Sequence, residues 1–275
     1  MNPATGEEID HVAEGTAAEV DRAVQAARAV VEQRAWTEDG ARRSRVLLRW
    51  ADRLEAHAAK VTEILTRENG KLVTESRIEV AATVDALRFS AGQARMLEGR
   101  SLTPAPGLYS DIVPEPLGVV AFIVPWNWPL LLLMRELAPA LAAGNAGVIK
   151  PASSTPLALT EVVRLVADDA ELLPGTINVV LGPGGSIGEA LVTHPQVNAI
   201  SFTGSTQMGR RVMALASQTP KKVLLELGGK SPNVIFPDTP LDKAIPILIR
   251  AMFGTAGQIV WRRPASSFIA LCSAR

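Results

Sequence analysis

The sequence predicts an α/β protein in which a doubly wound, mostly parallel sheet follows a helical N-terminal part. Apolar residues recur at helical spacing up to about residue 100. After Leu117, short apolar runs alternate with helical stretches. This alternation is typical of strands that are buried on both faces and joined by helical crossovers.

Three helices are expected in the N-terminal part. The first follows Thr16 and Glu19, which have the spacing of a capping box. The second places apolar residues on one face over 47–65 and ends at Gly70. The third is expected over about 74–97, with its apolar residues turned inward. Together these helices would cover one side of the later sheet.

The segment 101–116 separates the helices from the sheet. It is rich in Pro and Gly and cannot hold a helix, so we expect a crossover or an extended arm. Strands are expected at Gly118–Ile123, Gly147–Lys150, Ile177–Leu181, Asn198–Phe202, Val223–Leu227 and Asn233–Phe236. Helices are expected between them at Leu130–Ala143, Pro156–Asp169, Ser186–Thr193 and Gln207–Ser217.

Composition excludes several classes of function. The 28 basic residues balance 28 acidic ones, which gives no electrostatic footprint for nucleic acid or an anionic membrane. The single cysteine, Cys272, excludes an internal disulfide and fits a reducing compartment, so we expect a cytoplasmic protein. The apolar run from Leu117 to Met134 contains Pro125, Asn127 and Pro129, which argue against a membrane span. No metal-ligand spacing is present.

Four polar residues lie at or just after the end of an expected strand. They are Asn127, Lys150, Ser205 and Glu226. In open α/β sheets, ligands bind at the carboxyl ends of the strands, where the strand order switches. Each residue has an ordinary alternative role, but together they could line one crevice.

Two of the four suggest a phosphate or sugar ligand. Ser205 follows Gly204 and precedes a helix, so it is either a simple N-cap or a donor to a phosphate on the helix dipole. Lys150 is either a solvated surface lysine or reaches ribose hydroxyls or a phosphate. Gly182 and Gly184 repeat the strand–glycine–helix pattern, which is consistent with a nucleotide.

The other two suggest a reaction. Asn127 lies between two tryptophans and two prolines, where its amide either stabilises the turn or donates to an oxyanion. Glu226 lies within an apolar strand, so its carboxylate is either salt-bridged or a base whose pKa is raised by burial. Gly228 and Gly229 allow a ligand to approach the backbone closely.

These motifs, in their order and spacing, resemble the NAD(P)-dependent aldehyde dehydrogenase superfamily. The resemblance covers residues 2 to about 259, and its segments are Asn-Pro-Ala-Thr-Gly-Glu, Pro-Trp-Asn-Trp-Pro, Lys-Pro-Ala, Phe-Thr-Gly-Ser-Thr, Leu-Glu-Leu-Gly-Gly-Lys and Phe-Gly-Thr-Ala-Gly-Gln. In that family a cysteine thiolate attacks an aldehyde, hydride passes to the nicotinamide, and water activated by a glutamate hydrolyses the thioester to an acid.

The resemblance implies a role for each matching residue. Asn127 would hold the oxyanion and Glu226 would be the general base. The cofactor site would be lined by Ile123, Trp126, Lys150, Gly184, Gly204, Ser205 and Leu227. NAD-preferring members commonly place a glutamate where this chain has Ser153, and the missing carboxylate removes repulsion against a 2′-phosphate. We therefore expect NADP or NAD as cofactor, with NADP accepted.

The family pattern breaks at Val260, where a cysteine is expected. Loss of one nucleotide from the Ile259 codon explains the change, because ATT followed by GTN contains TGT. The same shift turns the tail into Cys-Val-Ala-Pro-Ala-Arg-Val-Val-Val-His-Arg, which resembles the family continuation. Cys272 lies well past the family position and is a poor substitute. We hypothesise a frameshift, which sequencing of the locus would test.

These patterns divide the chain into four parts. Residues 1–100 would be the helical part of the cofactor domain, 101–116 a fragment of a bridging arm, 117–229 the dinucleotide-binding core, and 230–275 the start of an incomplete catalytic domain with an aberrant tail from about 260. Intact family members are homo-oligomers, and we expect this fragment to be poorly soluble and not to assemble normally.

Three functions follow from this division. The first is an aldehyde dehydrogenase acting on a small-molecule aldehyde, and the second is a non-catalytic nucleotide-binding remnant. A thioester hydrolase that uses Glu226 alone has little support.

Overall fold

The computed structural model describes residues 1–229, 235–236 and 238–258. Val260 and Cys272, on which the frameshift hypothesis depends, lie outside the described residues, as does the first half of the expected strand Asn233–Phe236. The helices are α1 (Ala17–Val31), α2 (Arg34–Thr37), α3 (Gly40–Ala56), α4 (Ala58–Asn69), α5 (Val73–Gln93), α6 (Pro129–Ala142), α7 (Leu157–Arg164), α8 (Glu189–Thr193), α9 (Thr206–Ala216) and α10 (Leu241–Phe253). The strands are β1 (Arg100–Ala105), β2 (Leu108–Ile112), β3 (Val119–Ile123), β4 (Ala146–Lys150), β5 (Ile177–Val179), β6 (Ala199–Gly204) and β7 (Lys222–Leu227).

The predicted doubly wound sheet is confirmed. Five parallel strands lie in the order β5-β4-β3-β6-β7. The chain moves outward from β3 through β4 to β5, then returns to β6 and moves outward to β7 in the other direction. The strand order therefore switches between β3 and β6, and that switch point is where ligands bind in such sheets.

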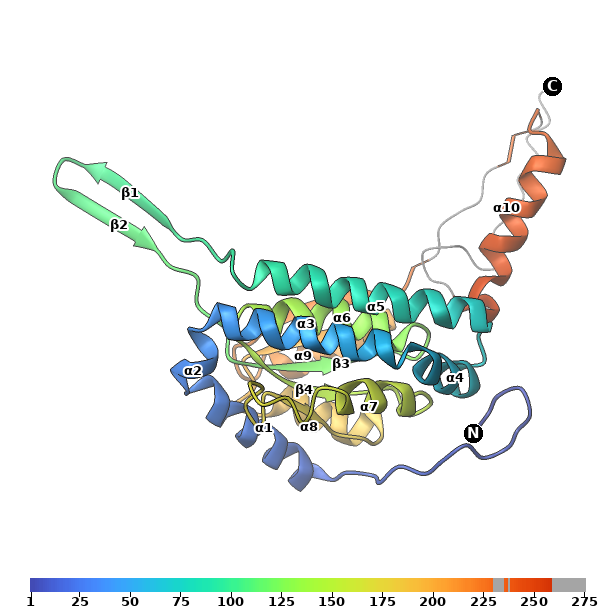
Figure 1. The fold of residues 1–275 in the computed structure, drawn as a ribbon, viewed down its shortest axis with the longest axis horizontal. Coiled ribbons are helices and arrows are strands. Elements are labelled where there is room, and N and C mark those ends of the chain that lie inside the picture. Colours follow the sequence, from blue (N-terminus) through green and yellow to red (C-terminus); the bar gives the residue numbers. More distant parts are fainter. Residues whose placement is uncertain (230–234, 237, 259–275) are drawn as a thin grey trace.

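Helices cover both faces of this sheet. Helix α6 packs on β3 and β4, and α3 and α5 pack in turn over α6. Helix α1 packs against β3, β4 and β5, and α9 packs against β6 and β7. Figure 1 shows α5 lying across the top of this stack, above α3 and α6. The core between these layers includes the fully buried side chains of Trp36, Trp50, Leu130 and Met134.

The N-terminal helices form largely where the spacing predicts them. Thr16 caps α1 with its hydroxyl, and the Glu19 side chain accepts from the Thr16 amide at 2.8 Å, so the capping box is confirmed. Gly70 ends α4 in the left-handed conformation, with a φ of 80°. The single helix expected over 47–65 is wrong, because His57 leaves the helical conformation and separates α3 from α4.

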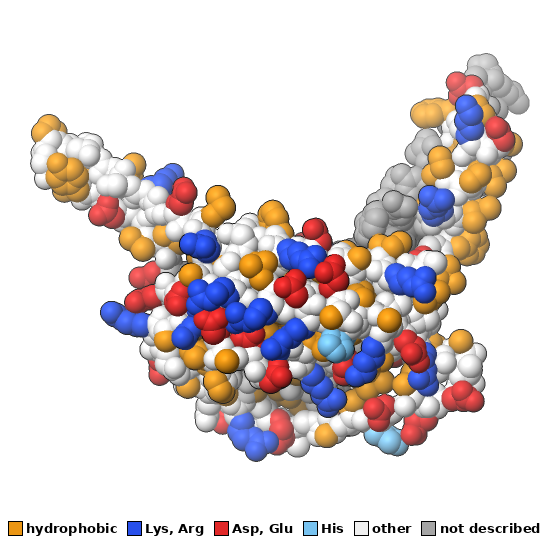
Figure 2. Space-filling view, in the orientation of Figure 1, with side chains coloured by type: hydrophobic (Ala, Val, Ile, Leu, Met, Phe, Trp, Pro, Cys, Tyr) orange, Lys and Arg blue, Asp and Glu red, His pale blue; other side chains and the backbone are white. Residues whose placement is uncertain are grey.

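Two segments project from the body of the molecule (Figure 1). The expected arm at 101–116 is an antiparallel hairpin of β1 and β2, turning at Gly107 with a φ of 77°. The other projection is α10, none of whose residues is buried. Figure 2 shows basic and acidic side chains interleaved over the body, while hydrophobic side chains gather on the two projections.

The apolar run from Leu117 to Met134 contains the predicted strand and the predicted helix start. The run forms β3, a turn and the start of α6, so it is divided between a strand and a helix. Among the described residues, no helix is long and apolar enough to cross a membrane.

Candidate functional site

A cavity of about 350 Å³ lies at the switch point between β3 and β6. Five of the predicted cofactor residues line it: Ile123, Trp126, Gly184, Gly204 and Ser205. They come from the ends of β3 and β6, from the turn after β3 and from the start of the π-helical turn 184–188. The structure therefore brings together residues that are separated by up to 82 positions in the chain (205 minus 123).

Ser205 begins α9 at the edge of this cavity. Its hydroxyl oxygen accepts from the Met208 amide at 3.2 Å, so the N-cap role is confirmed. The first turn of α9 has no acidic residue, which leaves its positive dipole end without a neutralising carboxylate of its own. A second acceptor, such as a phosphate oxygen, can therefore bind there.

The neighbouring helices α6 and α7 begin differently. Glu79 accepts from the Leu130 amide of α6 at 2.8 Å, and Glu68 accepts from the Leu157 and Ala158 amides of α7, each at 2.8 Å. These carboxylates already occupy the N-terminal amides of both helices. An anion at this edge of the sheet is therefore directed to α9.

Lys150 ends β4 and is almost completely buried, with 4% of its surface exposed. The solvated surface lysine considered as an alternative is therefore wrong. The ammonium donates to the Pro151 carbonyl oxygen at 2.7 Å. Burial lowers the pKa of Lys150 because the charged form loses hydration. An ammonium has three donors, so Lys150 retains hydrogen-bonding capacity for a ligand.

Ser153 and Leu227 lie beside the cavity rather than in its lining. Ser153 lines a smaller hollow of about 170 Å³, and Ala152 lines both this hollow and the cavity at the switch point. The Ser153 hydroxyl donates to the Gly182 carbonyl oxygen at 3.2 Å. A Cβ added to Gly209 of α9 would lie 2.5 Å from the Leu227 side chain, so these two residues are in close contact.

Asn127 is 8% exposed and follows β3. Its amide nitrogen donates to the Gln258 carbonyl oxygen at 3.0 Å, so the amide binds a remote segment instead of its own turn. A carboxamide has two N–H donors, and the second remains available for an oxyanion. The preceding Trp126 is 49% exposed and faces the cavity.

Glu226 differs from its prediction. The premise that an apolar strand buries this carboxylate is wrong, because 51% of its side chain is exposed. Strand β7 lies at the edge of the sheet, and exposed residues alternate with half-buried ones along it. The Arg135 guanidinium of α6 lies 3.7 Å from the Glu226 carboxylate, which agrees with the salt-bridged alternative.

The expectation of one crevice lined by all four polar groups is also wrong in detail. Asn127, Lys150, Ser205 and Glu226 all lie at the carboxyl edge of the sheet, as predicted. Only Ser205 lines the cavity itself. Lys150 lies below the surface at the end of β4, and Asn127 and Glu226 contact Gln258 and Arg135 respectively.

Sequence reasoning missed a pair of buried charges, one between α4 and α5 and the other in α5. Lys71 and Glu79 form an ion pair in which both side chains are fully buried. Burial lowers the pKa of Lys71 and raises that of Glu79, and each partner's charge opposes the shift. Glu79 belongs to the buried stripe of α5 that includes Val80, Thr83 and Leu87. The presence of Glu79 among the inward-facing residues of α5 was the signal that could have indicated a buried ion pair.

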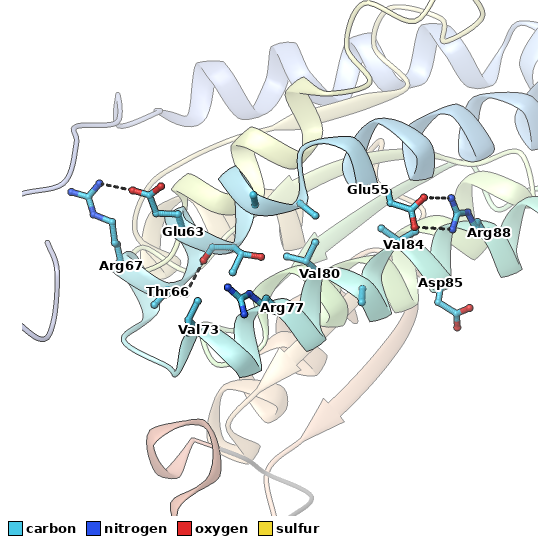
Figure 3. Close-up of a pocket in the computed structure, with 14 residues that line it drawn as sticks. Glu55, Glu63, Thr66, Arg67, Val73, Arg77, Val80, Val84, Asp85 and Arg88 are labelled. Carbon is cyan, nitrogen blue, oxygen red and sulfur yellow. Dashed lines mark hydrogen bonds and ion pairs between the residues drawn. The ribbon is translucent and has the colours of Figure 1, made fainter.

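A larger cavity lies elsewhere. It has a volume of about 850 Å³ and lies between α4 and α5. Figure 3 shows Val80 and Val84 within it and the Glu55–Arg88 and Glu63–Arg67 ion pairs along it. No strand end of the described chain reaches this groove, so we assign the candidate site to the smaller cavity at the switch point.

The described residues contain no group of three His, Cys, Asp or Glu side chains that could hold a metal ion. The lining of the switch-point cavity instead fits a nucleotide. Ile123, Phe202 and Val212 offer apolar surface to a base, and the open start of α9 offers amides to a phosphate. Gly204 keeps the space clear, since a Cβ there would lie 2.6 Å from the Phe202 ring.

Comparison with known proteins agrees with this geometry. A family model described as the aldehyde dehydrogenase family matches residues 1–263. The chain belongs to that family. It is 42% identical to aldehyde dehydrogenase family 2 member B4 of Arabidopsis thaliana over 262 residues, which covers 94% of this chain and 48% of the relative. Phenylacetaldehyde dehydrogenase of Pseudomonas fluorescens is 41% identical, with 94% and 53% covered.

Solved structures of aldehyde dehydrogenases share the fold. Betaine aldehyde dehydrogenase of Staphylococcus aureus, in complex with NAD+, has a TM-score of 0.91 and 35% identity, and the match covers 95% of this chain and 52% of that one. PnpE in complex with nicotinamide adenine dinucleotide has a TM-score of 0.89 and 38% identity, with 94% and 53% covered. The chain thus spans about half the length of the aldehyde dehydrogenases it matches.

Proposed function

We propose that this aldehyde dehydrogenase chain binds NADP or NAD in the cavity between β3 and β6. The observation that carries the proposal is the juxtaposition, at the switch point, of an apolar cavity with the start of α9, whose first turn has no acidic residue. The NAD complexes of two structural neighbours support it. When bound, the nicotinamide of such a cofactor accepts a hydride.

In this proposal each residue has a defined task. Ser205 and the first amides of α9 bind a phosphate, and Lys150 donates to ribose hydroxyls. Gly204 and Gly184 leave the backbone open to the ligand, and Trp126 covers one side of the cavity. The same proposal includes the division of the chain, in which residues 117–229 form the dinucleotide-binding core and follow the bridging arm at 101–116.

The whole protein, we propose, oxidises a small-molecule aldehyde to a carboxylic acid through a cysteine thioester. Asn127 donates its free amide N–H to the oxyanion, and Glu226 serves as general base for the hydrolytic water. The exposure of Glu226 allows water to reach its carboxylate. The salt bridge with Arg135 must open for that role.

For the chain as written we propose nucleotide binding without turnover, because Val260 replaces the nucleophile. The hypothesis of a frameshift accounts for this replacement. The protein encoded in the original reading frame would then be active. We also retain a cytoplasmic location and homo-oligomerisation of intact members as proposals.

Calorimetric titration of the purified chain with NADP and with NAD tests the binding. Ser205→Asp is the informative variant, because aspartate keeps the N-cap of α9 but places a negative charge where the phosphate binds. Gln33→Asp adds a negative charge at the N-cap of α2, whose first turn also has no acidic residue and which does not line the cavity, and is the matched control. We expect binding by the wild type and the control, and at least a tenfold loss, on the order of 1.4 kcal/mol, in Ser205→Asp.

Two results would contradict the proposal. If the folded wild-type chain gives no binding heat with NADP or NAD, the cavity is not a dinucleotide site. Production of NADPH or NADH from an aldehyde by the chain as written would refute the missing turnover. Restoring the reading frame at codon 259 should yield that activity.

A further inference from the structure

Charged and polar residues from α4, α5 and the segment between them bond to the turn between β3 and α6 and to the start of α6. Lys71 follows α4 and Glu79 lies in α5, and their side chains pair with no exposed surface. A buried ion pair of this kind contributes little net stability compared with an apolar pair of similar size. Its presence therefore calls for another explanation than stability.

Both members of the pair also bond to the turn or the helix that follows it. The Lys71 ammonium donates to the Asn127 carbonyl oxygen at 2.7 Å and lies 4.8 Å from the centre of the Trp128 ring. The other oxygen of Glu79 accepts from the amides of Leu130 and Leu131, at 2.8 and 3.2 Å. One ion pair thus fixes a carbonyl, an indole ring and the start of α6.

A third residue extends the same contact by one position. The Asn69 side-chain amide donates to the Trp126 carbonyl oxygen at 2.6 Å. Asn69 and Lys71 therefore bind consecutive carbonyl groups of the turn, those of Trp126 and Asn127. Trp126 lines the cavity, and Asn127 is the residue proposed above as the oxyanion donor.

We propose that Lys71 and Glu79, with Asn69, are positioning residues that set the orientation of the Trp126–Trp128 turn. Their function is to hold the Asn127 amide and the Trp126 ring in place, not to contact a ligand. The inference rests on the proposed function for the role of Asn127. The orientation itself can be measured without any ligand.

The double variant Lys71→Met/Glu79→Gln tests this inference. Each single variant leaves one buried charge without its partner and can fail to fold, whereas the double variant has neither charge. Glutamine retains a carbonyl oxygen that can accept from Leu130, so α6 keeps its cap. What the double variant loses is the Lys71 contact with Asn127 and Trp128.

Arg49→Met/Asp169→Asn provides the matched control. This pair joins α3 to the segment after α7 through contacts of 2.7 Å and does not touch the turn. It removes a part-buried charge pair from the same domain, in which the Arg49 side chain is 38% exposed. A change that follows from loss of any ion pair would appear in both double variants.

The two readouts are the side-chain amide resonance of Asn127, assigned by its loss in Asn127→Asp, and the Kd for NADP. In the Lys71→Met/Glu79→Gln chain we expect the resonance to shift or broaden and the Kd to rise by roughly tenfold. The control should leave both unchanged. An unchanged resonance in the folded double variant would overturn the inference. Failure of the wild type to bind NADP would overturn the proposed function instead, and the resonance would still decide the positioning.

Discussion

Replacing Lys150 by methionine should make the chain more stable and, at the same time, a weaker binder of NADP. The opposite signs follow from the position of the ammonium at the end of β4, where it is 4% exposed and donates to the Pro151 carbonyl oxygen. Methionine has a similar length and no charge. It removes the cost of burial together with the donor.

The magnitudes can be worked from these contacts. Burying an ammonium costs several kcal/mol, and its hydrogen bond to one carbonyl returns about 1.5–3 kcal/mol. The variant should therefore gain roughly 1–2 kcal/mol in free energy of unfolding. Loss of one charged hydrogen bond to a ribose hydroxyl should cost about 1.5–3 kcal/mol of binding, which raises the Kd for NADP by roughly 10- to 150-fold.

Lys221→Met is the control. Lys221 is half-buried and lies just before β7, at the amino ends of the strands, whereas Lys150 lies at the carboxyl ends. The Lys221 ammonium donates to the His194 carbonyl oxygen. Burial lowers the pKa of Lys221, as it does for Lys150. Urea denaturation gives the stability of each variant, and calorimetry gives its affinity for NADP. Lys221→Met should bind like the wild type.

One outcome would refute this reasoning. If Lys150→Met lowers the free energy of unfolding and leaves the Kd unchanged, the buried ammonium is a structural residue and does not reach the cofactor. An equal loss of affinity in Lys221→Met would show that the effect is not specific to the site.

Two other substitutions make separable predictions. Ser153→Glu should shift preference from NADP toward NAD, measured as the ratio of the two Kd values, because the new carboxylate repels a 2′-phosphate; an unchanged ratio contradicts the role of position 153. Burial raises the pKa of Glu68 to about 7 from an ordinary 4.5, so the folded chain holds a proton that the unfolded chain releases between those values. The contribution of Glu68 to stability should therefore be complete below pH 4.5 and fall by about 3 kcal/mol as the pH rises to 7. Glu68→Gln should flatten that part of the pH profile of unfolding, and an equally steep profile in the variant would contradict the assignment.

The elements that could be predicted from the sequence are those whose apolar residues are buried in the core. The strands around Val120 and Val148 are apolar along their length because helices cover both faces of the sheet. The hairpin at 100–112 could be predicted only as an arm, since all residues of its two strands are exposed and show no alternation. His57 interrupts the second helix without the Pro or Gly that would announce a break.

The site was predictable where a residue's role depends on its place at a strand end, as for Ser205 and Gly204. The site was not predictable where a residue's role depends on which other elements pack against its strand or helix. Glu226 lies in an apolar strand, yet one face of β7 is open in the described chain. Glu79 is a charge on a buried helical stripe, and only the fold shows that it meets Lys71 and the start of α6.

The N-terminal helices therefore do more than cover the sheet. Neither α6 nor α7 has a side-chain cap from its own N-cap residue, and both instead begin on carboxylates that α4 and α5 supply, Glu68 and Glu79. Helix α9 is capped by its own Ser205 and receives no such carboxylate in the described structure. Because side-chain oxygens from α4 and α5 occupy the amides at two helix starts and not at the third, the strongest attraction for a phosphate at this edge lies beside the cavity. In the proposed function, the preference of the site for a dinucleotide depends as much on where anions are excluded as on where one is bound.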